Sequence, residues 1–290
     1  MAILVTGAGG LVGKAAVAAL AEQGIEHVRA VLRDPAASGD LRRHGAKVAV
    51  MDATDPDSME AALTGVFTAV SLTGSLWAEP GAGAGPPQRA STAAAVLEPA
   101  RVLVAAARRV GVRRLVVLSP ARPGGSSRNP WLQAKAEVEE LVAGSGLEYA
   151  VLRCTHVVGP GSRLAERLRG PGPVAVPGSG GQRVAPVWVG DVARAIAIAD
   201  DHPGPLHVTW ALAGPGSTTF DGFVDALNQA TVAKLHLDGD PDAVRRAGLS
   251  PVQAEVLAAD SLPDPAVPPA PGVTPLPLPE AVARSRPAPR

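Results

Sequence analysis

This chain of 290 residues is poor in cysteine, in tyrosine and in net charge. Its single cysteine, Cys154, excludes an internal disulfide framework and is typical of a protein of the reducing cytoplasm. The 27 basic and 27 acidic residues are scattered and cancel, which excludes the basic footprint of a nucleic-acid-binding protein. No basic leader precedes the first apolar stretch and glycines interrupt it, so we expect no signal peptide, no membrane segment and a cytoplasmic location.

The histidines show no metal-ligand spacing, so the sequence predicts no metal site. Five of the six lie far from one another in the sequence: His27, His44, His202, His207 and His236. Ala, Gly and Pro are abundant, and Arg far outnumbers Lys. This bias is typical of GC-rich bacterial genomes and indicates no particular chemistry.

The most informative stretch is residues 3–13, an apolar strand followed by a glycine-rich turn and a helix. In such a turn Gly7 makes the tight bend, Gly10 lets the backbone approach a pyrophosphate, and Gly13 lets the helix pack on the sheet. The start of helix 11–23 offers free N–H groups and a dipole that favour phosphates. We therefore predict a dinucleotide site, the alternative being a glycine-rich turn without a ligand. The predicted cofactor residues here are Thr6, Gly7, Gly9, Gly10, Leu11, Val12 and Gly13.

Short β-branched runs alternate with helical stretches along residues 1–154, which favours βαβ units. We predict a Rossmann-type α/β core, a doubly wound parallel sheet that binds its ligand at the carboxyl ends of the strands. The predicted strands are 2–6, 27–32, 46–51, 66–72, 113–118 and 148–153, and the predicted helices are 11–23, 36–44, 56–64, 91–110 and 131–144.

The pattern changes after residue 154, and we expect residues 155–260 to form a small α/β lobe on the substrate side, integrated with the core. The predicted strands of this lobe are 174–176, 183–188 and 206–210, and its predicted helices are 190–200 and 219–230. Asp191 stands where it can cap the first of these helices.

Two segments have the composition of irregular structure. Residues 78–90 are rich in Gly and Pro and follow the fourth strand, so we expect either a lid over the cofactor side or a loose surface loop. From Ser261 to the end, ten of thirty residues are proline. We therefore expect residues 261–290 to be an extended or disordered tail.

An ordered set of motifs runs through residues 2–230. It comprises the glycine turn, Arg33-Asp34-Pro35 after the second strand, Asp52 after the third, and the stretches 110–119, 135–141, 146–153 and 187–195. Together these motifs resemble the atypical short-chain dehydrogenase/reductase family. Within it they are most similar to the NmrA-like, NAD(P)H-binding branch of quinone- and isoflavone-reductase-like proteins.

The resemblance implies that Arg33 selects the cofactor. A guanidinium at the end of the second strand can hold the 2′-phosphate of NADP(H) in a forked contact; the alternative is a solvated charge. Asp52 would contact the adenine amino group, and it can also cap the turn that follows it. Ala53, Leu72 and Thr73 complete the predicted cofactor site.

The chain departs from the family at the catalytic tyrosine. Most short-chain dehydrogenases place a tyrosine four residues before the active-site lysine, and here that pair is Trp131 and Lys135. Indole has an N–H donor but no usable acid chemistry at neutral pH. The single tyrosine, Tyr149, lies in an apolar strand and is predicted to belong to the core. Tyrosine-dependent carbonyl reduction is therefore disfavoured.

Three residues remain as catalytic candidates. Lys135 would bind the nicotinamide ribose and assist proton transfer, or else be a solvated helix residue. Ser119, which ends the fifth strand, would border the nicotinamide and bond a substrate oxygen, or merely end the strand. His156 would supply the proton that the tyrosine cannot, or simply pack within its loop. Cys154 is interpreted as a small buried apolar residue.

These features predict an NADP(H)-dependent reductase of a small apolar carbonyl, quinone or enone, possibly in a pathway of secondary metabolism. The expected partner is a small-molecule substrate, and the expected state is a monomer or homodimer. Two alternatives stay open: an NmrA-like regulator that binds the dinucleotide without turnover, and a non-redox cyclase or isomerase on the same scaffold.

Overall fold

The computed structural model describes the chain except for residues 78–91, 125–126, 171 and 287–290, so the expected lid at 78–90 lies outside the described residues. Its centre is a seven-stranded parallel sheet in the order β11-β6-β5-β4-β1-β2-β3. The strands are β1 (Ala2–Thr6), β2 (Val28–Leu32), β3 (Lys47–Val50), β4 (Val66–Ser71), β5 (Arg114–Pro120), β6 (Glu148–Cys154) and β11 (His207–Leu212). The predicted Rossmann-type fold is confirmed.

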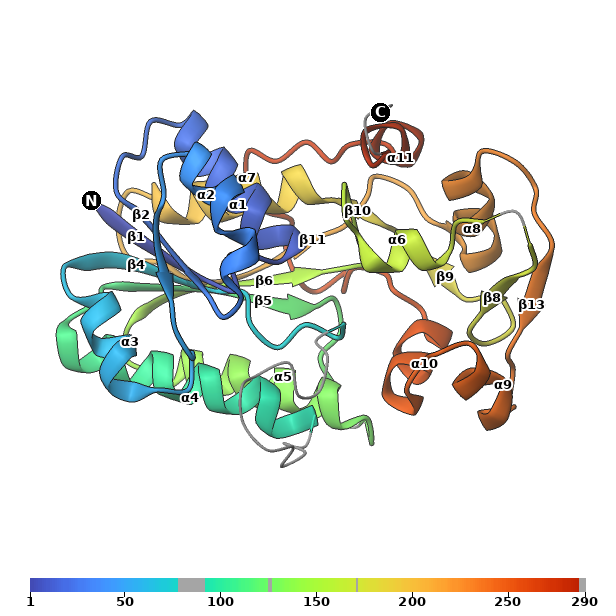
Figure 1. The fold of residues 1–290 in the computed structure, drawn as a ribbon, viewed down its shortest axis with the longest axis horizontal. Helices are drawn as coiled ribbons and strands as arrows, with labels where there is room; N and C mark the ends of the chain where they lie inside the picture. Colours follow the sequence, from blue (N-terminus) through green and yellow to red (C-terminus); the bar gives the residue numbers. More distant parts are fainter. Residues whose placement is uncertain (78–91, 125–126, 171, 287–290) are drawn as a thin grey trace.

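Helices cover both faces of this sheet (Figure 1). One face carries α1 (Leu11–Glu22), η1 (Pro35–Ala37), α2 (Ser38–Arg43) and α7 (Val189–Asp200), and the other carries α3 (Pro56–Leu63), α4 (Thr92–Val110) and α5 (Pro130–Ala143). The central strands are apolar on both sides, as a sheet buried between two helical layers requires. The strand order reverses between β1 and β4, and a crevice at that reversal is where such sheets bind ligands.

A smaller lobe lies beyond the carboxyl ends of the strands (Figure 1). Its core is apolar and centres on Phe220 and Phe223 of α8. Its elements are β7 (Val157–Val158), α6 (Arg163–Arg167), β8 (Val174–Val176), β9 (Arg183–Val184), β10 (Val187–Trp188), β12 (Thr218–Thr219), α8 (Phe220–Asn228), β13 (Lys234–His236), α9 (Pro241–Arg246) and α10 (Pro251–Ala258).

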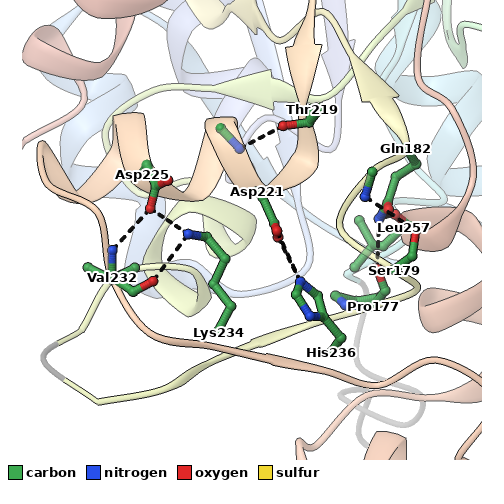
Figure 2. A network of polar contacts seen from close by, with 12 residues as sticks. Pro177, Ser179, Gln182, Thr219, Asp221, Asp225, Val232, Lys234, His236 and Leu257 are labelled. Atoms are coloured by element: carbon green, nitrogen blue, oxygen red, sulfur yellow. Dashed lines mark hydrogen bonds and ion pairs between the residues drawn. The ribbon is translucent and has the colours of Figure 1, made fainter.

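Polar contacts join the pieces of this lobe, as Figure 2 shows. Lys234 of β13 lies 2.6 Å from the carboxylate of Asp225 on α8, and the His236 ring lies 3.0 Å from Asp221 on the same helix. The side-chain amide of Gln182 donates to the carbonyls of Pro177 and Leu257, which ties α10 to the segment after β8.

Two elements predicted for the lobe belong to the core instead. The strand predicted at 206–210 is β11, which pairs with β6 along its whole length and forms one edge of the main sheet. Helix α7 packs against α1 on the face of that sheet. The apolar residues Trp210 and Leu212 explain this placement, because they bury against the core cluster rather than the lobe.

The prediction of a tail that cannot pack is wrong for residues 261–286. The extended part lies along β11, where the N–H of Ala211 donates to Pro268 and the N–H of Ala270 donates to Ala211. Helix α11 (Leu278–Arg284) follows, and its Ala281 and Val282 are fully buried against the lobe. The carboxylate of Asp191 does not cap α7; it accepts from the N–H of Leu276 and holds the tail. Proline favours this extended path because few backbone N–H groups then need partners.

Candidate functional site

The glycine turn has the geometry of a ligand cradle. Gly7 has a φ of +68°, and a Cβ there would lie 2.8 Å from the carbonyl oxygen of Leu72. A Cβ on Gly13 would collide with the Gly7 carbonyl and with Ala8, so α1 packs closely on the turn only because Gly13 has no side chain. Gly10 is the N-terminal cap of α1 and has no side chain to satisfy the helix's first N–H groups. Those donors are left for a ligand.

A cavity of about 1310 Å³ runs from this turn along the carboxyl ends of the strands to the lobe. Its volume exceeds the roughly 300–1,000 Å³ of a site for one drug-sized ligand, so it can hold a dinucleotide and a second molecule. Most of the predicted site residues line it: Gly7, Gly9, Gly10, Leu11, Val12, Gly13, Arg33, Leu72, Thr73, Ser119, Lys135 and His156.

Three predicted cofactor residues are not among those that line the cavity. Thr6 is buried, and its hydroxyl donates to the carbonyl of Val70 within the sheet. The carboxylate of Asp52 accepts from the backbone and the hydroxyl of Thr54, and these bonds, helped by nearby Arg33, lower the pKa of Asp52. Ala53 packs against the core. The turn-capping alternative for Asp52 therefore has direct support.

Arg33 lies just beyond the end of β2, exposed and on the cavity wall beside the glycine turn. The neighbouring Asp34 also lines the cavity, and Oδ1 of its carboxylate accepts from the N–H of Ala36 and caps η1. The guanidinium of Arg33 is a cation that this rim of the cavity offers to a phosphate.

Lys135 lies on the buried face of α5, with 7% of its surface exposed. Its Nζ donates to the carbonyl of Thr73 at 3.2 Å and to that of Leu118 at 3.3 Å, between the ends of β4 and β5. Burial lowers the pKa of Lys135 to about 8, although Glu139 opposes the shift. The alternative of a solvated helix lysine is wrong.

Trp131 occupies the position that the family gives to tyrosine. Its indole Nε1 donates to the carbonyl of Gly74 at 2.9 Å, and the side chain is 92% buried, so its one polar hydrogen is committed within the protein. Tyr149 lies at the amino end of β6, away from the cavity, with its ring edge-on to His207. Neither residue can replace the missing acid.

Ser119 and His156 carry buried polar atoms that no described protein group satisfies. The hydroxyl of Ser119, 4% exposed, has no hydrogen-bond partner, and neither has Nε2 of His156. The His156 ring meets Phe220 edge-on, and burial lowers its pKa to about 4, which keeps the ring neutral at pH 7. Among the described residues with such atoms, only Ser119 and His156 line the cavity. Buried polar atoms without partners are rare, and on a cavity wall they are candidates to bind a ligand or an ordered water.

Cys154 lies on the cavity wall but behaves as the sequence predicted. It is 6% exposed, and burial raises the pKa of its thiol well above the ordinary value, with Lys135 opposing the shift. A thiol held protonated in this way is not a nucleophile.

The sequence analysis missed several residues of the cavity wall. Arg122 lies on the loop after β5 and Arg163 begins α6 shortly after β7, positions near strand ends from which ligand-contacting residues often come, and that signal was available. Trp77, Leu257 and Asp260 come from segments with no recognisable motif. Leu257 and Asp260 reach the cavity only because the chain passes through the lobe.

The fold and the cradle define a dinucleotide-binding α/β protein. Comparison with known families is consistent with this: a family model described as NAD(P)H-binding matches residues 7–197. The chain therefore belongs to the NAD(P)H-binding family, and the resemblance to the NmrA-like, atypical short-chain dehydrogenases is confirmed. No helix within the described residues is both long and apolar enough to span a membrane.

Two curated proteins are similar in sequence. A 3-diazoavenalumate denitrifying reductase of Streptomyces is 31% identical over 72% of this chain and 76% of its own length. The photosystem II assembly factor Ycf39 of Cyanophora paradoxa is 28% identical over 53% of this chain, and the match covers only 44% of that protein.

Solved structures share the fold at lower identity. The NADPH-dependent quinone oxidoreductase QOR2 of Escherichia coli, solved with NADPH, has a TM-score of 0.71 and 21% identity over 97% of this chain and 98% of its own. MoeE5, solved with UDP-glucuronic acid and NAD, has a TM-score of 0.67 and 21% identity over 89% of this chain and 97% of its own. At these identities the likeness shows the fold alone.

Proposed function

We propose that this protein is an NADP(H)-dependent reductase of a small apolar quinone, enone or carbonyl compound. The observation that carries the proposal is the pair of buried, partnerless polar groups, Ser119 and His156, on a cavity that begins at the glycine turn. The reductase among the sequence relatives supports the reaction class. The cavity wall is mainly apolar, which supports an apolar substrate.

The residues present fit a dinucleotide. The turn at Gly7 and Gly13 leaves no room for side chains, the first turn of α1 offers N–H groups to a pyrophosphate, and Arg33 offers a fork to a 2′-phosphate. When bound, NADP(H) supplies the hydride. Every other contribution to the proposed reaction comes from the protein's own residues.

Lys135, Ser119 and His156 would then act on the substrate side. The Ser119 hydroxyl and the neutral His156 ring would bind the oxygen on which negative charge develops. Lys135, with a pKa near 8, would hold a proton that it can give up at physiological pH. A quinone or enone spreads the developing charge over several atoms, so it needs a weaker acid than a simple ketone does. The lack of a tyrosine at position 131 favours such acceptors.

Cofactor choice is tested by calorimetric titration with NADPH, NADP⁺ and NADH. We expect Arg33→Ala to weaken NADPH binding roughly 10- to 100-fold, the value of a charged forked contact, and to leave NADH binding unchanged. Arg42→Ala, which removes an exposed arginine of α2 away from the cavity, is the matched control. An unchanged NADPH-to-NADH preference in Arg33→Ala would remove Arg33 from the cofactor site.

Turnover is tested by NADPH oxidation with a panel of quinones, enones and simple ketones. We expect the conjugated acceptors to react faster, and Lys135→Met to lower the rate roughly 100-fold. The control is Lys47→Met, at the opposite end of the sheet. Tight NADPH binding without turnover would favour an NmrA-like regulator instead. Failure of every dinucleotide to bind would favour a non-redox cyclase or isomerase.

A further inference from the structure

A forked ion pair lies directly behind Lys135. Nη2 of Arg153, at the end of β6, is 2.6 Å from the Glu139 carboxylate, and Nε is 3.1 and 3.2 Å from its two oxygens. The two side chains are 23% and 12% exposed, so the pair is largely removed from water. Such a contact is worth more than a surface ion pair and fixes both side chains.

Glu139 has a second possible partner in Lys135. The two residues are four apart on α5, the spacing at which a carboxylate and an ammonium meet on one face of a helix. The structure does not close that pair: Nζ of Lys135 turns to the carbonyls of Thr73 and Leu118, at the cavity, and the carboxylate turns to Arg153.

We propose that Arg153 is a positioning residue that holds Glu139 away from Lys135 and so keeps the lysine amine at the cavity wall. The value of the arrangement to a reaction rests on the function proposed above, whereas the arrangement itself is testable without turnover. Without Arg153, the free carboxylate would draw the ammonium back along the helix and away from the ends of β4 and β5.

Among the described residues, few titratable groups face Lys135 and Arg153. Lys135 is faced by Glu139 from its own helix and by the protonated thiol of Cys154 from β6, and the Trp131 ring centre lies 5.8 Å from Nζ. Arg153 is faced by Glu139 and, from the tail, by Asp264, both of which raise its pKa. Glu139 therefore lies between Arg153 and Lys135. Because its carboxylate binds Arg153, it raises the pKa of Lys135 less than it would if it bound the lysine.

The test is an NMR titration of Lys135. The chain has only four lysines, so ¹³C-labelled lysine side chains give few signals, and Lys135→Met identifies the one that matters. We expect Arg153→Met to raise the pKa of Lys135 by roughly one pH unit, because Glu139 then acts on it unopposed. Glu139→Gln should lower it, because the nearest negative charge is gone and Arg153 remains.

Loss of either charge alone already shifts the pKa of Lys135 in opposite directions in these two variants, so the deciding variant is Arg153→Lys, which keeps the charge but loses the fork. It should raise the pKa of Lys135 to a value between those of the wild type and Arg153→Met, because a lysine cannot hold both oxygens of Glu139. It also serves if Arg153→Met does not fold. A wild-type pKa in Arg153→Lys, or no shift in Arg153→Met, would overturn the proposal. An absence of turnover in the wild type would overturn the proposed function and leave this result standing.

Discussion

The buried polar side chains at the two ends of strand β5 differ in their hydrogen bonding. At its amino end Arg114 is 1% exposed, yet its guanidinium donates twice to Glu148 and once each to the carbonyls of Ala199, Asp200, His202 and Gly204. At its carboxyl end Ser119 is 4% exposed, and its hydroxyl has no hydrogen-bond partner in the part of the chain that the structure describes.

The difference separates a structural group, Arg114, from Ser119, which the proposed function assigns to a ligand. Arg114 ties β5 to the end of α7, whose last carbonyls carry the negative end of the helix dipole and therefore attract a cation. Every contact it makes is supplied by the chain. Ser119 lines the cavity of about 1310 Å³, and no described residue supplies its hydroxyl with a partner. An unsatisfied buried hydroxyl costs roughly 1–3 kcal/mol, which a bound oxygen atom can recover.

Loss of the Arg114 side chain, at the amino end of β5, should have the largest effect on stability. Arg114→Met leaves Glu148 and four carbonyls without their donor, so we expect the free energy of unfolding to fall by roughly 3–5 kcal/mol in urea denaturation. Arg113→Ala is the matched control, because Arg113 binds the same carboxylate at 2.7 Å but is 53% exposed, and it should cost less than about 1 kcal/mol. Equal losses in the two variants would mean that burial at this end adds nothing.

The next largest effect should come from acid acting on His156, which shares with Ser119 a buried polar atom on the cavity wall that has no partner among the described residues. The folded pKa of His156, about 4, lies below its ordinary value of 6.5, so the unfolded chain takes up the proton first. Its contribution to stability is therefore complete above pH 6.5 and is lost as the pH falls toward 4. Between pH 7 and pH 5 we expect this one group to remove about 2 kcal/mol.

The measurement is chemical denaturation at both pH values. His156→Gln should lose less stability than the wild type between pH 7 and pH 5, and the difference is the contribution of the imidazole. His44→Gln, at an exposed position, should keep the wild-type dependence. If His156→Gln follows the wild type throughout, the ring is not held neutral by burial.

The sequence predicted the first 154 residues well because their signals are local. The glycine turn, the apolar strands and the helices between them are each visible within a short stretch of sequence, and so is the tryptophan, rather than tyrosine, four residues before Lys135. The strand at 207–212 was assigned to the wrong part of the molecule because its partner, β6, lies far earlier in the chain, with His207 paired to Tyr149. Nothing in the strand itself indicates that partner.

Burial and hydrogen bonding could not be predicted from the sequence for the same reason, since both depend on segments that are distant in the chain. Arg113 and Arg114 are adjacent and identical in the sequence, yet only the second is buried, because α7 returns to that end of the sheet. The tail has the composition of a disordered segment, but Ala281 and Val282 find an apolar surface that only the folded lobe presents. Motifs located most residues of one cavity wall, but which polar atoms there lack described partners depended on the fold.

The smallest loss of stability should come from the change at Ser119. Ser119→Ala removes a hydroxyl that bonds to no described protein group, so the free energy of unfolding should not fall and can rise by up to about 1–3 kcal/mol, while NADPH oxidation with a quinone falls at least roughly tenfold. Ser162→Ala is the contrasting variant: this buried serine also lines the cavity, but its hydroxyl donates to Val157 and caps α6, so its loss should cost about 1 kcal/mol. If Ser119→Ala is the more destabilising of the two, the hydroxyl has a structural partner after all, and the two ends of β5 do not differ in the way their hydrogen bonds indicate.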